Sequence, residues 1–112
     1  MAADFDKVEW VPQAILNVPL DYFTTKCGLL FFEGQDDLDV YEGANLQLPD
    51  GCPYALRHYR GYPADTVTIY LPFEVQDVDE ISTLVRTIIA FWHLPQNVIG
   101  WERRDGLPNL KT

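Results

Sequence analysis

The chain of 112 residues has the length of one ordinary domain, and 47% hydrophobic with 22% charged residues is a globular composition. Its 17 acidic and 8 basic residues give a formal net charge of −9. A surface of that sign repels phosphate backbones and anionic lipids, which argues against nucleic-acid and membrane partners, and the apolar runs are too short to span a bilayer. We therefore expect a single domain over residues 1–112.

The start of the chain and its two cysteines favour a cytoplasmic protein. Residues 1–6 are acidic and contain no apolar signal stretch. Cys27 and Cys52 lie far apart and have no CxxC spacing, so free thiols are expected in place of a disulfide or a metal site. The sequence has no phosphate-binding glycine loop and no metal-ligand spacing, and we expect no cofactor.

The first 27 residues are expected to form an extended segment. Pro12 and Pro19 interrupt any long element. This segment is predicted to place three apolar side chains on the core: Trp10, Ile15 and Leu16. At the other end of the chain, residues 105–112 are expected to be a flexible tail.

Three stretches in the first half predict strands. Residues 29–32 form an apolar run between Gly28 and Gly34, which is typical of a buried strand. Residues 39–41 and 45–48 flank Glu42-Gly43-Ala44, which we interpret as a tight hairpin.

The pairing of two later strands decides which side chains the sheet leaves uncovered. Residues 54–60 and 66–71 both alternate in polarity. If Leu56 pairs with Leu71, Leu56 lies on the face of Val67 and Ile69; a slip of one residue inverts every assignment. The first register buries the better apolar set. It predicts an uncovered face that carries Arg57, Tyr59, Thr68 and Tyr70.

A helix is predicted over residues 78–94, and a final strand over 98–103. Asp77 and Glu80 are typical of a helix start. Apolar residues then recur at spacings of three and four and form one stripe: Ile81, Leu84, Val85, Ile88 and Trp92. Pro95 ends the helix. A crossover through this helix can place the final strand parallel to residues 66–71.

These elements predict an α+β fold, a two-layer sandwich with a mostly antiparallel sheet of about four to six strands and one long helix packed on one face. The three tryptophans, Trp10, Trp92 and Trp101, are interpreted as core side chains. One helix covers only part of such a sheet. Its other face is therefore either covered by the N-terminal segment or available to a partner.

Acidic residues are concentrated in the first half of the chain, which has no basic residue between Lys26 and Arg57. We predict that this acidic segment binds a basic protein, because opposite charge speeds association and sets orientation. The predicted contact residues are Glu33, Asp36, Asp37, Asp39 and Glu42, with Tyr41 as an aromatic anchor. The first hypothesis is therefore a non-enzymatic acidic binding module, an inhibitor or immunity-type protein, by analogy with other small acidic α+β proteins.

Two alternatives remain open from the sequence. Arg57, His58, Tyr59 and Arg60 are the densest group of chemically capable side chains. A small hydrolase or nuclease would use His58 as general base, an arginine to neutralise charge and a carboxylate such as Glu102. The third hypothesis is a homo-oligomeric scaffold, for example a homodimer, that uses an uncovered sheet face or an edge strand.

Overall fold

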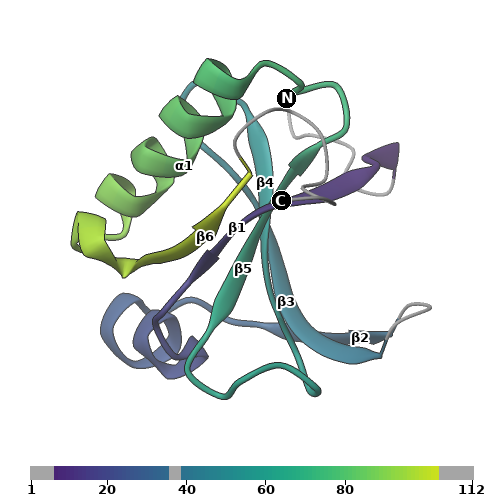
Figure 1. The fold of residues 1–112 in the computed structure, drawn as a ribbon. Coiled ribbons are helices and arrows are strands. Elements are labelled where there is room, and N and C mark those ends of the chain that lie inside the picture. The colour runs from purple at the N-terminus through teal and green to yellow at the C-terminus, as the bar shows by residue number, and fades with distance from the viewer. Residues whose placement is uncertain (1–6, 36–38, 104–112) are drawn as a thin grey trace.

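The computed structural model describes residues 7–35 and 39–103. They form one six-stranded sheet with an α-helix on one face, an α+β architecture (Figure 1). The strands are β1 (Trp10–Leu16), β2 (Phe32–Gln35), β3 (Val40–Gln47), β4 (Pro53–Tyr59), β5 (Val67–Pro72) and β6 (Ile99–Glu102). The helix α1 is Val78–Phe91, and two short helical turns are η2 (Tyr22–Lys26) and η3 (Gln96–Val98). The strand order is β2-β3-β4-β5-β1-β6, with all paired neighbours antiparallel.

The N-terminal segment contributes a strand inside the sheet. β1 pairs with β5 on one side and with β6 on the other. Pro12 lies where the β1–β5 register shifts, and an irregular position tolerates the missing N–H. The sequence predicts an extended segment that lies on the core, whereas residues 10–16 form a strand of the sheet itself. Since neighbours in a strand point to opposite faces, Leu16 enters the core while Ile15 lies on the far side of the sheet.

The predicted hairpin at residues 42–44 is wrong. β3 runs without interruption from Val40 to Gln47, and Gly43 lies in its middle. A Cβ atom at Gly43 would lie 3.1 Å from the carbonyl oxygen of Leu56 and 3.1 Å from Cγ of Arg57. The absence of a side chain at Gly43 therefore lets the Arg57 side chain pack close to the β3 backbone, and Gly43 forms no turn.

The start of α1 is confirmed, but the helix is shorter than predicted. Asp77 is the N-cap, and its carboxylate accepts the backbone N–H three residues later at 2.9 Å. The helix ends at Phe91, three residues before its predicted end. His93 adopts a φ of 60°, and the Leu94 N–H donates to the carbonyl oxygen of Ile89 at 3.0 Å. This left-handed closure ends the helix before Pro95 is reached.

The last strand runs parallel to β5, as the crossover predicted, but the two are not neighbours. β6 is antiparallel to β1, and β1 is antiparallel to β5, so β1 lies between the two parallel strands. β6 begins at Ile99 because the preceding residues form the turn η3. A salt bridge of 2.8 Å from Arg86 to Glu102 joins α1 to β6.

The main core lies between α1, η2 and the sheet. Its buried side chains come from β1, β4, β5, α1 and the connecting segments, among them Leu16, Phe23, Leu56, Ile69, Val85 and Ile88. At its edge the Trp92 Nε1–H donates to the Tyr54 hydroxyl at 3.0 Å. Burial raises the pKa of Tyr54 to about 12, so this phenol stays neutral under physiological conditions.

Candidate functional site

The sheet face opposite α1 is the best candidate for a functional surface. Leu56 pairs with Ile69 in place of Leu71, a shift of two residues that leaves every side chain on its predicted face. Arg57 therefore lies opposite Thr68, which confirms the side chains predicted to share this face. The prediction that the face is uncovered holds only in part, because Tyr59, Thr68 and Tyr70 are 2%, 2% and 6% exposed, whereas Arg57 is half-buried. No helix or strand within residues 7–35 and 39–103 lies over it. We call it the open face, defined by Trp10, Ile15, Tyr41, Arg57, Tyr59, Thr68, Tyr70 and Trp101.

Arg57 is held at the middle of the open face by aromatic rings. Its guanidinium carbon lies 4.4 Å from the centroid of Tyr41 and 4.9 Å from that of Tyr70, and Nη1 donates to the Tyr59 hydroxyl at 3.3 Å. Burial, and then the neighbouring Tyr59, raise the pKa of Tyr70 well above its usual value. A cation fixed on tyrosine rings is preorganised, and such Arg–Tyr groups dominate the energetics of many interfaces.

A row of ring contacts continues from β2 to the turn after β4. The ring centroids of Phe32 and Tyr41 are 6.1 Å apart, those of Tyr41 and Tyr59 are 5.2 Å apart, and those of Tyr59 and Tyr62 are 5.5 Å apart. Tilted and edge-on contacts of this kind stabilise one arrangement of the rings. The row therefore gives the open face a fixed shape.

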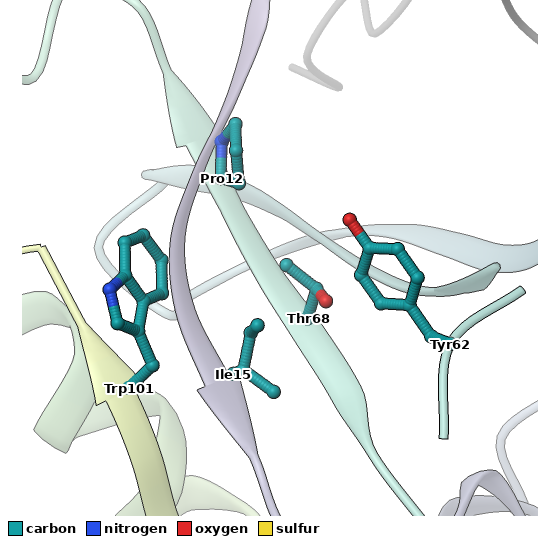
Figure 2. A pocket seen from close by; sticks show the side chains of 5 residues that line it. All are labelled: Pro12, Ile15, Tyr62, Thr68 and Trp101. Atoms are coloured by element: carbon teal, nitrogen blue, oxygen red, sulfur yellow. The ribbon is translucent and has the colours of Figure 1, made fainter. Parts of the chain in front are cut away.

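A cavity of about 390 Å³ opens beside this row (Figure 2). We call it the aromatic slot, lined by Pro12, Ile15, Tyr62, Thr68 and Trp101. Trp101 and Tyr62 stand on opposite sides, with Ile15 and Thr68 between them (Figure 2). Thr68 is only 2% exposed, and its Oγ1 atom has no hydrogen-bond partner among the residues that the structure describes.

A second cavity, of about 280 Å³, adjoins the first. It is lined by Asp39, Tyr59, Gly61 and Tyr62, so Tyr62 belongs to both cavities. One carboxylate oxygen of Asp39 accepts the N–H of Val40 at 2.7 Å. A carboxylate thus borders the aromatic part of the open face.

The structure separates two of the predicted acidic contact residues, Glu33 and Glu42, from their aromatic anchor, whereas Asp39 borders the open face. Glu33 and Glu42 lie opposite each other on β2 and β3, whereas Tyr41 points to the open face because strand neighbours alternate. Arg60 donates to Glu33 at 2.8 Å, and both side chains are well exposed, so this pair contributes little to stability. Asp36 and Asp37 lie outside the described residues.

The alternative catalytic group is not brought together. Arg57 and Tyr59 lie on the open face, while His58 and Arg60 alternate to the other side. The His58 Nδ1 atom lies 2.9 Å from the carbonyl oxygen of Thr66, a bond to the backbone.

The other side chains that could take part in catalysis or metal binding are Glu102 and the two cysteines. Glu102, the proposed carboxylate, pairs with Arg86 on the helix side of the sheet. Within residues 7–35 and 39–103 no group of three His, Cys, Asp or Glu side chains could hold a metal ion. Cys27 and Cys52 are free thiols. Burial, then Asp50 and Glu80, raise the pKa of Cys52, which weakens it as a nucleophile.

The sequence interpretation missed the aromatic slot. Trp101 was assigned to the core, but it lines the slot opposite Tyr62. Its position depends on the pairing of Ile15 with Trp101, two residues far apart in the sequence. Of the five residues that line the slot, Thr68 alone is predicted by the strand alternation to lie on this face.

Comparisons with models of known families, with characterised proteins and with solved structures give no match for this chain. In the described part of the chain, no helix is long and apolar enough to cross a membrane. Function is therefore argued from the open face and from the charge of the chain.

Proposed function

We propose that the protein is a non-enzymatic binding module that engages a basic protein partner, in the manner of an inhibitor or immunity-type protein. The observation that carries the proposal is the open face, a sheet surface on which Arg57 is fixed between Tyr41 and Tyr70. Interface centres are enriched in tyrosine, tryptophan and arginine. A surface that is ordered before binding loses less side-chain entropy on association.

The charge of the chain supports a basic partner. A net charge of −9 attracts a positively charged protein over several ångströms, and this attraction is screened by salt. Glu33, Asp39 and Glu42 lie on or beside the β2–β3 hairpin, whose Tyr41 belongs to the open face. In the proposal these carboxylates steer the partner, and the half-buried side chains of the open face, Tyr41, Arg57 and Trp101, make the close contacts.

The test begins with capture of the partner from host lysate at low and high salt, about 50 and about 500 mM, with identification by mass spectrometry. Association of the recovered partner is then measured with two variants that change the net charge equally, Glu42→Lys and Glu74→Lys. Both side chains are exposed, but only Glu42 belongs to the sheet. We expect Glu42→Lys to slow association about tenfold and to flatten its salt dependence, with a small effect of Glu74→Lys.

A third variant tests the open face itself. Arg57→Met keeps most of the side-chain stem and removes the guanidinium. It should speed dissociation of the partner at least tenfold, since truncated interface arginines act mainly through the dissociation rate. Unchanged dissociation, together with equal effects of the two charge variants, would refute the proposed function. Circular dichroism of each variant shows that the fold is intact.

A further inference from the structure

The aromatic slot has the shape and lining of a pocket for an apolar group. Trp101 and Tyr62 stand on its two sides, and Pro12 and Ile15 complete the apolar lining (Figure 2). An apolar side chain placed between two rings gains dispersion contacts on both of its sides and leaves water. A cavity of about 390 Å³ lies within the range of pockets that hold ligands, and its lining residues come from β1, β5, β6 and the β4–β5 turn.

The buried hydroxyl of Thr68 is the second observation. Oγ1 has no hydrogen-bond partner in the described structure, although a valine side chain would fill the same space without an unsatisfied polar group. A threonine hydroxyl can donate or accept a hydrogen bond. An occupant of the slot that offers a backbone N–H or C=O would satisfy it.

Tyr62 lines the slot together with Thr68. Its side chain lies on the turn between β4 and β5 and is 39% exposed, and exposed side chains change rotamer within nanoseconds. A small displacement of the Tyr62 side chain, with its ring still beside the slot, would let a polar atom of the occupant reach Oγ1.

The charges near the slot indicate what flanks the apolar group. Tyr62 also lines the cavity that contains Asp39, and the exposed Asp65 lies on the same turn as Tyr62. Carboxylates at one end of an apolar slot favour a lysine or arginine beside the buried group.

We infer that the aromatic slot is the anchor pocket of the open face, and that it binds an apolar side chain in an extended segment of the partner, with a lysine or arginine next to that side chain. This inference rests on the proposed function and deepens it. The backbone of that segment supplies the hydrogen bond to Thr68, and the rings of Trp101 and Tyr62 enclose the apolar side chain.

The test uses synthetic peptides and the full-length protein. The first peptide is acetyl-Gly-Lys-Leu-Lys-Gly-amide, and its controls replace leucine by alanine or both lysines by glutamate. Binding is followed by the NMR signals of the Trp101 indole N–H and the Ile15 methyl groups. Replacement of leucine by alanine removes three carbons, and we expect either control to bind at least tenfold more weakly.

Variants of the slot separate its walls from its polar group. Tyr62→Ala removes one wall and should weaken binding of the leucine peptide at least fivefold. Phe91→Ala is the matched control, since Phe91 is a similarly exposed aromatic residue at the end of α1, 47% accessible, and it should leave binding unchanged. Thr68→Val keeps the shape of the slot and should weaken binding several-fold without loss of folding.

Three outcomes would overturn the inference. The first is an absence of NMR shifts at Trp101 and Ile15 up to about 10 mM peptide, a concentration at which even very weak binding is seen. The second is equal affinity for the leucine and alanine peptides. The third is a set of shifts that depend on protein concentration alone, which would assign the slot to contacts between copies of this chain. If the peptide does not bind but Arg57→Met speeds dissociation of the partner, the slot inference fails and the proposed function stands. If the peptide does not bind and Arg57→Met leaves dissociation of the partner unchanged, the slot inference and the proposed function both fail.

Discussion

The salt bridge between Arg86 and Glu102 holds the strand that carries Trp101. An Arg86 N–H donates to the Glu102 carboxylate at 2.8 Å; the glutamate side chain is 3% exposed and the arginine side chain 41% exposed. Among the strands of residues 7–35 and 39–103, β6 lies at the edge of the sheet and pairs with β1 alone. Arg86→Met keeps the apolar stem on α1 but leaves the buried carboxylate without its arginine.

The expected loss of stability follows from this geometry. Removal of one partner of a fully buried ion pair costs about 3–5 kcal/mol. Because Arg86 is partly exposed, water screens the pair, and we expect a loss of about 2–3 kcal/mol. Unfolding entropy is about 2.1 cal/mol/K per residue, which for this chain is about 0.24 kcal/mol/K. Arg86→Met should therefore lower the Tm by about 10 °C.

The assay is urea and thermal unfolding of the wild type, Arg86→Met, Glu102→Gln and the double variant. Glu102→Gln removes the buried charge, so the double variant should recover most of the stability lost in Arg86→Met. A loss below about 0.5 kcal/mol in Arg86→Met, the usual size of a surface substitution, would refute the reasoning. So would a double variant whose loss equals the sum of the two single losses, since additivity means that the groups do not interact.

Three further predictions concern single residues. Thr68→Val should stabilise the protein by about 1 kcal/mol in urea unfolding, because it removes an unsatisfied buried hydroxyl; a destabilised variant would show that Oγ1 has a partner. Gly43→Ala should cost about 1–3 kcal/mol in the same assay, since the new Cβ meets the backbone of Leu56, and an unchanged urea midpoint would argue against this close approach. The folded pKa of Tyr54 lies near 12, above its usual value of 10.0, so the stability from its neutral form is complete below pH 10 and is lost as the pH rises toward 12. Tyr54→Phe should show a shallower loss of stability over that interval in pH-dependent thermal unfolding, and an identical slope would contradict the burial of this phenol.

The parts of the fold that depend on local signals were predictable. The Asp77 cap and the apolar stripe of α1 depend on residues within a few positions of one another. The composition of the open face was predictable because strand alternation survives a register error of two residues, so the pairing of Leu56 with Ile69 in place of Leu71 changed nothing on it.

The errors came from contacts between distant residues. Gly43 has the local signature of a turn, but its neighbour in space is Arg57, which the sequence does not reveal. The segment around Pro12 gave no indication that it would pair with two strands from the second half of the chain. The helix ended early because His93 adopts a left-handed conformation, which residues other than glycine uncommonly take.

The candidate site was predicted in part for the same reason. The acidic residues were found by counting charges, but alternation along β3 placed Tyr41 on the opposite face from Glu42. The arginine and tyrosines of the open face were found from the register. Trp101 and Tyr62 could not be placed, because one depends on the β1–β6 pairing and the other on the course of a turn.

The position of β1 between β5 and β6 has a consequence for the order of folding. Residues 10–16 can complete their hydrogen bonds only after residues 67–72 and 99–102 have been synthesised. Pairings over such sequence separations slow the search for the native state, so the chain should fold in milliseconds to seconds. On the ribosome β1 would wait exposed until β6 has emerged, and its apolar residues would be available to chaperones throughout that interval.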